Sequence, residues 1–155
     1  KDIILILAGK GVMEKKHRAL AAKLGVNVMW GIYTPQELLR IINMSDLYVP
    51  PADAEIEAIA CMEAFTCGIV PVISNHPKSA TKMFALDDRC LFDHGKPEEL
   101  AKKMDYWLDN PAEKDAMSKR YIEYAKEFRI EKSAAKMETM FQDAIAYYHN
   151  LYATM

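Results

Sequence analysis

Three carboxylates stand in one short apolar stretch of the sequence, "EIEAIACMEAFTCGIVPVI", which runs from Glu55 to Ile73. The stretch predicts a buried helix that leads into a buried strand. Burying an unpaired carboxylate is costly or shifts its pKa, so acids at such positions need partners. An ionised carboxylate has two oxygens, and these can accept hydrogen bonds from two neighbouring hydroxyls, such as those of a ribose.

The three acids differ in how easily a purely structural role explains them. Glu55 and Glu57 lie at the start of a helix predicted from about residue 56 to 66, where each complements the helix dipole by about 0.3–1 kcal/mol. That role accounts for one acid more easily than for two. Glu63 lies in the middle of the helix, and its apolar neighbours favour a helix without a solvated face. We therefore interpret Glu63 as a carboxylate directed at a ligand.

The spacing of Glu55 and Glu63 fits one class of ligand. Eight residues of unbroken helix would separate them by roughly 12 Å along the axis. That is about the distance from the ribose of a nucleotide sugar to its sugar. The free N–H groups of the first helical turn would face the same space and suit a diphosphate. The pattern favours a nucleotide-sugar site.

Strands and helices alternate along the chain, which predicts an α/β fold. We expect a Rossmann-like parallel sheet with helices on both faces and extra C-terminal helices up to about residue 152. In such sheets ligands bind outside the carboxyl ends of the strands, where Glu55 follows the third strand. Thr34, Pro35 and Glu37 form a capping box at another helix start. The predicted strands are "DIILILAGKG", "VNVMWG", "DLYVPP", "VPVIS" and "RCLFDH".

Composition excludes several classes of protein. The 155 residues are 51% hydrophobic and 27% charged with a net charge of −2, which favours one globular domain without a nucleic-acid patch. The three cysteines are expected to be free thiols. The longest aliphatic run, Ile3 to Ala8, is far shorter than a membrane span. The chain opens at Lys1 almost directly in a predicted strand, which favours an excised fragment.

A nicotinamide-dependent oxidoreductase is one alternative. "GKGVME" after the first strand offers the first two glycines of a dinucleotide fingerprint, but Glu14 replaces the third. The second strand ends in Trp30 and Gly31, without the acidic residue that would bind the ribose. The motif is more typical of a tight strand-to-helix turn. His76 follows the fourth strand and is expected to line the ligand cleft.

The Glu55–Glu63 pair resembles the E-x₇-E signature of retaining glycosyltransferases of family 4, which have the two-domain GT-B architecture. The usual "E-G-F-G-L-x-x-x-E-A-x-A-x-G-x-P-V" is "EIEAIACMEAFTCGIVPV" here, with Glu57-Ala58-Ile59 in place of Phe-Gly-Leu. Most of the chain looks like the C-terminal, donor-binding domain. The stretch from Ser79 to Leu86 is similar to bacterial diacylglycerol and cholesterol α-glucosyltransferases.

The resemblance implies a role for each candidate residue. Glu63 would bind the ribose hydroxyls of UDP, and Glu55 would act in catalysis by orienting the donor glucose. No metal and no cofactor would be needed, since UDP-glucose is a substrate. Backbone contacts would come from Glu57, Ala58 and Ile59 for the sugar and the distal phosphate, and from Ile32, Tyr33 and Thr34 for the uracil.

The resemblance also implies the biological setting. Residues 1–155 would form a single nucleotide-sugar-binding domain, without the N-terminal acceptor domain and without the first strand–helix unit, which carries basic side chains. Alone it would bind donor weakly and turn over nothing. The expected partners are a nucleotide-sugar donor, a lipid acceptor such as diacylglycerol and, through the full-length enzyme, a membrane surface, but no nucleic acid. The enzyme would be cytoplasmic and peripheral at the inner face of the membrane.

Other functions within this fold stay open. A GT-B relative could glycosylate a polysaccharide, or a nucleotide-sugar epimerase could bind UDP in a similar way and release free sugar. A degenerate or regulatory domain is a further alternative. The presence of both Glu55 and Glu63 disfavours that last alternative, because a domain without catalysis has no need of the pair.

Overall fold

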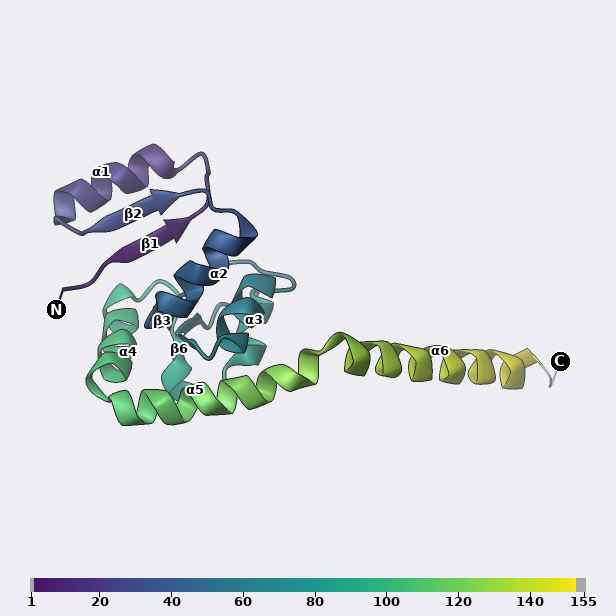
Figure 1. The fold of residues 1–155 in the computed structure, drawn as a ribbon. Coiled ribbons are helices and arrows are strands. Elements are labelled where there is room, and N and C mark those ends of the chain that lie inside the picture. Colours follow the sequence, from purple (N-terminus) through teal and green to yellow (C-terminus); the bar gives the residue numbers. More distant parts are fainter. Residues whose placement is uncertain (1, 153–155) are drawn as a thin grey trace. The chain divides into compact units, whose positions relative to one another are not determined.

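The computed structural model describes residues 2–152, which belong to two compact units (Figure 1). The first unit is bounded by Lys1 and Met44, and the second by Ser45 and Met155. Each unit is built around its own parallel strands, and each is considered by itself.

Unit 1 is a strand–helix–strand–helix segment. Its two strands pair in parallel, with Leu5 opposite Val28 and Ala8 opposite Gly31. Gly25 follows the first helix, and its left-handed φ of 64° is typical of a helix C-cap. The elements of unit 1 are β1 (Leu5–Ala8), α1 (Glu14–Leu24), β2 (Val28–Gly31) and α2 (Pro35–Met44).

The capping box predicted at the start of α2 is present. The N–H of Thr34 donates to Oε2 of Glu37 at 2.8 Å, and the N–H of Glu37 donates to Oγ1 of Thr34 at 3.3 Å. These reciprocal bonds satisfy two N–H groups that the helix itself cannot. The backbone N–H of Thr34, followed by its hydroxyl, also lowers the pKa of Glu37.

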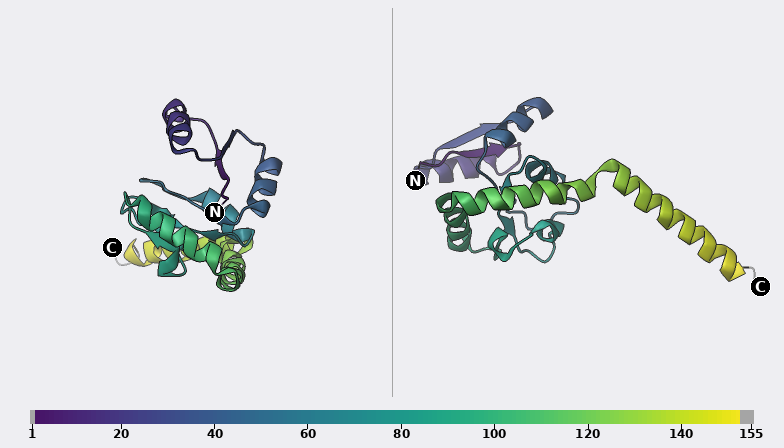
Figure 2. Two further views of the ribbon diagram at one scale, coloured as in Figure 1. Left: turned by 90° about the vertical axis from the view of Figure 1, so that its left-hand side faces the viewer. Right: turned by 60° about the horizontal axis from the view of Figure 1, so that its bottom comes forward.

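Unit 2 contains the rest of the strands and helices. Three long helices follow the last strand, and α4 packs beside α5 (Figure 2). The elements are β3 (Leu47–Tyr48), α3 (Ile59–Thr66), β4 (Val70–Pro71), β5 (Ile73–Ser74), the 3₁₀ helices η1 (Ala80–Phe84) and η2 (Asp88–Cys90), β6 (Leu91–Phe92), α4 (Pro97–Asp109), α5 (Pro111–Ala125), the 3₁₀ helix η3 (Lys126–Phe128) and α6 (Ile130–Tyr152).

The predicted strand "VPVIS" is divided into two short strands, β4 and β5. β4 pairs in parallel with β3, and β5 pairs in parallel with β6. Between them the N–H of Val72 still donates to the carbonyl of Tyr48 at 2.8 Å. The segment 70–74 therefore bonds to β3 on one side and to β6 on the other. Every described strand pairing is parallel, so the predicted α/β class is confirmed.

An aromatic cluster in the core fixes the position of α3. The ring of Phe65, on α3, is fully buried and lies 5.4 Å from the ring of Phe84 and 5.6 Å from that of Tyr121. Gly68, just beyond α3, has a φ of 79°, and a Cβ there would lie 2.7 Å from Oγ of Ser118. This close approach brings the end of α3 against α5, so glycine is required here.

Arg89 connects η2 to α4 through several bonds. Its guanidinium donates to both carboxylate oxygens of Asp87, at 2.7 and 2.8 Å, and to the hydroxyl of Tyr106 at 2.7 Å. The Arg89 carbonyl accepts from the indole N–H of the buried Trp107 at 3.2 Å. The hydrogen bond from Arg89 holds the pKa of Asp87 at about 2, below its ordinary 3.8.

The Asp87 carboxylate predicts a pH-dependent contribution to stability. Because its pKa is lower in the folded chain, the contribution is complete above about pH 5 and is lost as the pH falls toward 2. We expect Asp87→Asn to lower the free energy of unfolding by about 2 kcal/mol at pH 7. Urea unfolding should show this difference shrinking between pH 5 and pH 3.

Asp88→Asn is the matched control, since none of the described side chains forms an ion pair with Asp88. Its effect on unfolding should be small at pH 7. A difference for Asp87→Asn that stays constant from pH 7 to pH 3 would contradict the assignment of the effect to charge.

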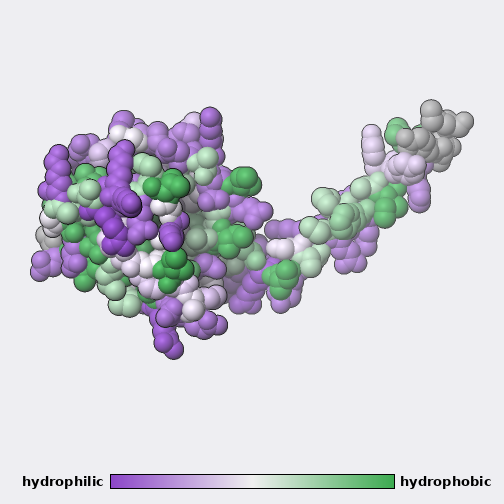
Figure 3. Space-filling view, turned by 90° about the horizontal axis from the view of Figure 1, so that it is seen from above, coloured by the Kyte–Doolittle hydropathy of each residue, from purple (hydrophilic) through white to green (hydrophobic). Residues whose placement is uncertain are grey.

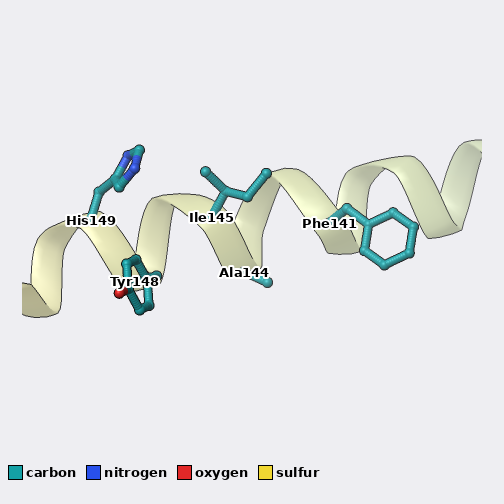
Figure 4. Close-up of a pocket in the computed structure, with 5 residues that line it drawn as sticks. All are labelled: Phe141, Ala144, Ile145, Tyr148 and His149. Atoms are coloured by element: carbon teal, nitrogen blue, oxygen red, sulfur yellow. The ribbon is translucent and has the colours of Figure 1, made fainter.

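The last helix, α6, exposes apolar residues along its length. All described residues of α6 up to Leu151 are exposed, and both hydrophobic and hydrophilic side chains lie on its surface (Figure 3). One hollow of 380 Å³ lies against this helix. Its lining comes from α6 alone, so the hollow has no opposing wall among the described residues. The lining residues are Phe141, Ala144, Ile145, Tyr148 and His149 (Figure 4).

Two further features follow the sequence-based predictions. The three cysteines lie outside any disulfide, as expected, and Cys61 and Cys90 are buried. None of the described helices is long and apolar enough to cross a membrane.

Candidate functional site

The segment before α3 differs from the prediction. The helix begins at Ile59, not at about residue 56, so the predicted start is wrong and no unbroken helix connects Glu55 to Glu63. The reason is local. Oε1 of Glu55 accepts from the N–H groups of Ile56 at 2.9 Å, Glu57 at 3.3 Å and Ala58 at 3.2 Å. A side chain that bonds to the backbone in this way offers the chain an alternative to helix.

These three N–H groups also set the charge state of Glu55. The N–H of Ala58, followed by those of Ile56 and Glu57, lowers the pKa of this carboxyl, so it is ionised at neutral pH. No described residue donates to the second oxygen, Oε2. The carboxylate is therefore held by one oxygen and can offer the other to a ligand hydroxyl.

Ala58 adopts a backbone conformation that is uncommon for alanine. Its φ is 54° and its ψ is 40°, the left-handed region, and it is the one non-glycine residue with a positive φ in the part of the chain that the structure describes. The conformation allows its N–H to reach Glu55 while its carbonyl accepts from Cys61 and Met62 in the first turn of α3. Such strain in the backbone is concentrated at functional sites in proteins.

Substitutions at Ala58 test this strain. Ala58→Val is expected to lower the free energy of unfolding by about 2 kcal/mol or more, because a β-branched side chain disfavours a positive φ and the site is buried. In Ala58→Gly, relief of the strain and loss of a buried methyl group, about 0.8 kcal/mol, should nearly cancel. Urea unfolding of both variants gives the comparison. Equal effects of valine and glycine would contradict a strained Ala58.

A pocket of 660 Å³ lies over this segment, a volume in the range of small-molecule sites. Its lining combines residues 54–60, which include two acids, with one lysine from a distant segment. The lining residues are Ala54, Glu55, Ile56, Glu57, Ala58, Ile59, Ala60 and Lys78.

A second segment completes the wall by pairing with Glu55. Glu55 forms a parallel bridge with Ser79, in which its N–H donates to the carbonyl of Lys78 at 3.3 Å and its carbonyl accepts from Ala80 at 2.8 Å. The N–H of Lys78 donates to Nδ1 of His76 at 3.1 Å. His76 therefore holds the loop that carries Lys78 and is not itself among the lining residues, in contrast to the expectation that it would line the cleft.

Glu63 lies outside the pocket, on the exposed face of α3. The premise that α3 has no solvated face is wrong: Cys61, Ala64 and Phe65 are buried, but Glu63 is exposed and Ile59 is 54% exposed. Exposure lowers the cost of the Glu63 charge, so the charge alone does not require a ligand. Glu63 remains accessible to a ligand on the face that begins at Ile59.

Tyr48 is a candidate that the sequence did not indicate. It ends β3, and burial raises its pKa to about 12, with smaller contributions from Cys61, Glu55 and Glu63. Its hydroxyl is therefore a neutral hydrogen-bond donor within the electrostatic field of both candidate carboxylates. No motif could have identified it, because its relation to them depends on the pairing of β3 with β4.

Comparison with known proteins identifies the family. Residues 1–128 match the family described as glycosyl transferases group 1. The chain belongs to this family. It is an enzyme domain of the glycosyltransferase class, and the predicted resemblance is confirmed. Among curated proteins, none matches the sequence.

Solved structures agree with this glycosyltransferase assignment. The catalytic domain of cholesterol-alpha-glucosyltransferase from Helicobacter pylori is 48% identical, with a TM-score of 0.80, over 83% of this chain and 80% of that chain. Sucrose-phosphate synthase from Thermosynechococcus elongatus is 17% identical, with a TM-score of 0.78, over 94% of this chain and 39% of that chain. The second likeness shows the fold alone, which is that of GT-B glycosyltransferases.

The glycosyltransferase brings part of its predicted site together. Glu55, Glu57, Ala58 and Ile59 line one pocket, and Glu63 follows one turn later on the same helix. The residues expected to hold the uracil lie in unit 1. There Ile32 is 73% exposed and the ring of Tyr33 lies over Gly31, whereas the N–H and hydroxyl of Thr34 are bonded to Glu37. These bonds to Glu37 cap the start of α2.

Family membership decides one alternative, and the described side chains bear on metal binding. A glycosyltransferase takes a nucleotide-sugar donor and an acceptor, which sets aside the nicotinamide-dependent oxidoreductase. Among the residues that the structure describes, no group of three His, Cys, Asp or Glu side chains could hold a metal ion.

Proposed function

We propose that this domain binds the donor of a retaining glucosyltransferase, with UDP-glucose as donor and a membrane lipid such as diacylglycerol or a sterol as acceptor. The observation that carries the proposal is the Glu55 carboxylate, ionised and held by three N–H groups at the start of α3, with Glu63 exposed on the same helix. The 48% identical cholesterol-alpha-glucosyltransferase supports the choice of glucose and of a lipid acceptor.

In the proposed complex the two carboxylates have separate roles. On donor binding Glu55 exchanges its bonds to the backbone N–H groups for hydrogen bonds from glucose hydroxyls and orients the sugar, as the catalytic residue of this domain. Glu63 accepts from the two hydroxyls of the ribose, a charge-assisted contact of about 1.5–3 kcal/mol. The diphosphate lies over the first turn of α3, where N–H groups favour anions. Stabilising this leaving group, without a metal, is the contribution of the domain to the transition state.

The backbone contacts of the donor belong to the same proposal. Ile59 begins α3 and lines the pocket, so its N–H is a candidate donor to the phosphate. The N–H groups of Glu57 and Ala58 become available when Glu55 turns toward the sugar. Ile32, Tyr33 and Thr34 remain candidates for the uracil. Because Thr34 already bonds to Glu37 through its N–H and hydroxyl, Ile32 and Tyr33 are the stronger two.

Calorimetric titration of the 155-residue chain with UDP, UDP-glucose and NAD tests the donor. We expect a measurable heat of binding for UDP and for UDP-glucose and none for NAD. Binding of NAD but not of UDP would contradict the proposal. Hydrolysis of UDP-glucose to free sugar and UDP by the enzyme that carries this domain, with no glycolipid formed from diacylglycerol or cholesterol, would favour the epimerase-like alternative.

Membrane attachment is tested separately on the enzyme that carries this domain. Because the proposed acceptor lies in a bilayer, the enzyme is expected to sediment with vesicles that contain anionic lipid. The absence of any binding to such vesicles would contradict a peripheral membrane enzyme and favour a polysaccharide acceptor.

A further inference from the structure

Lys78 has a fixed backbone and an exposed side chain at the edge of the pocket. Its carbonyl accepts from Glu55 at 3.3 Å, and its N–H donates to Nδ1 of His76 at 3.1 Å. The ring of His76 in turn lies 4.4 Å from that of His94, whose Nδ1 is 3.0 Å from Oδ1 of Asp53. Bonds on both sides of Lys78 therefore hold its Cα next to the start of α3.

The charges that line the pocket make Lys78 distinctive. The other two charged residues in the lining are Glu55 and Glu57, both acids. Two carboxylates alone would repel a phosphate group that approaches the start of α3. Lys78 is the one basic residue in the lining, and its ammonium forms no ion pair with any side chain that the structure describes.

We propose that Lys78 binds the diphosphate of the donor through its ammonium group, an inference that rests on the proposed donor site. An ammonium group carries a full charge and three N–H donors on a flexible stem, which suits phosphate oxygens of variable position. It offsets the repulsion from Glu55 and Glu57. It also supplies a cation to the leaving group from the loop between β5 and η1.

Titration of uridine and UDP against the 155-residue chain separates the phosphate contact from the rest of the site. Lys78→Ala is expected to weaken UDP binding by about ten- to a hundredfold, the range for loss of a charged hydrogen-bond partner. Uridine binding should be unchanged, because uridine has no phosphate. Lys78→Arg should recover part of the loss. Lys82→Ala, an exposed lysine in η1 outside the pocket, should change neither ligand.

Each outcome has a definite meaning. If the wild-type chain binds UDP and Lys78→Ala binds it equally well, the role of Lys78 is overturned while the donor site stands. If Lys78→Ala weakens uridine and UDP equally, the residue shapes the loop instead of binding phosphate, and the inference is also overturned. If the wild-type chain binds neither ligand, the proposed donor site fails, and the role of Lys78 fails with it.

Discussion

Replacing Glu63 by alanine is expected to weaken UDP binding by about ten- to a hundredfold, or roughly 1.5–3 kcal/mol. In the proposed site this carboxylate accepts hydrogen bonds from both ribose hydroxyls, and each loses a charged partner in the variant. The side chain is exposed, so the free energy of unfolding should change little. Calorimetric titration with UDP measures the first effect, and urea unfolding measures the second.

A UDP analogue without the two ribose hydroxyls makes the test specific to the contact. Wild type and Glu63→Ala should bind that analogue with equal affinity, since the partner hydroxyls are absent. Glu98→Ala removes an exposed acid from α4 and should leave UDP affinity unchanged. If Glu63→Ala weakens UDP and the analogue to the same extent, the ribose role of Glu63 is wrong.

Replacing Trp107 by alanine is expected to lower the free energy of unfolding of unit 2 by about 3–5 kcal/mol. The side chain is 0% exposed, its N–H donates to the Arg89 carbonyl, and the Arg89 guanidinium lies 5.2 Å from its ring centroid. The substitution thus leaves a large cavity and an unpaired carbonyl. Such a loss is a large part of the stability of an ordinary domain. Urea unfolding followed by circular dichroism measures it.

Two further variants keep the role of Trp107 testable if Trp107→Ala does not fold. Trp107→Phe keeps an aromatic ring but lacks the N–H donor, so an intermediate loss of about 1–3 kcal/mol is expected. Tyr147→Ala removes a ring that is 70% exposed on α6 and should change stability by less than about 0.5 kcal/mol. Equal effects at positions 107 and 147 would contradict the assignment of Trp107 to the core.

The beginnings of the helices show what the sequence could predict. Thr34, Pro35 and Glu37 specify the start of α2 by local chemistry, and the structure has the predicted bonds. The start of α3 was misplaced, because Ala58 is a strong helix former and nothing in its type indicates a left-handed backbone. The bonds from Glu55 to the backbone outweigh that propensity, as local competition of a polar side chain often does.

The site was predicted in part for similar reasons. Acids among apolar residues marked the segment that now lines a pocket, although Glu63 proved to be on a solvated face. Lys78 and Tyr48 were not predicted, because pairing between distant segments brings each of them to the site. Residue 55 pairs with residue 79, next to Lys78, and β3, which contains Tyr48, pairs with β4. Patterns within a single segment carry no information about such partners.

The bond from Glu55 to its own backbone has a consequence for the thermodynamics of binding. In the empty pocket this carboxylate acts as an intramolecular competitor, tethered at a high effective concentration over the N–H groups of Ile56, Glu57 and Ala58. A phosphate that takes those groups must displace it, so hydrogen bonds are exchanged and few are added. The favourable enthalpy of donor binding should be correspondingly modest. When the nucleotide leaves, the carboxylate bonds to these N–H groups again, which favours rapid product release.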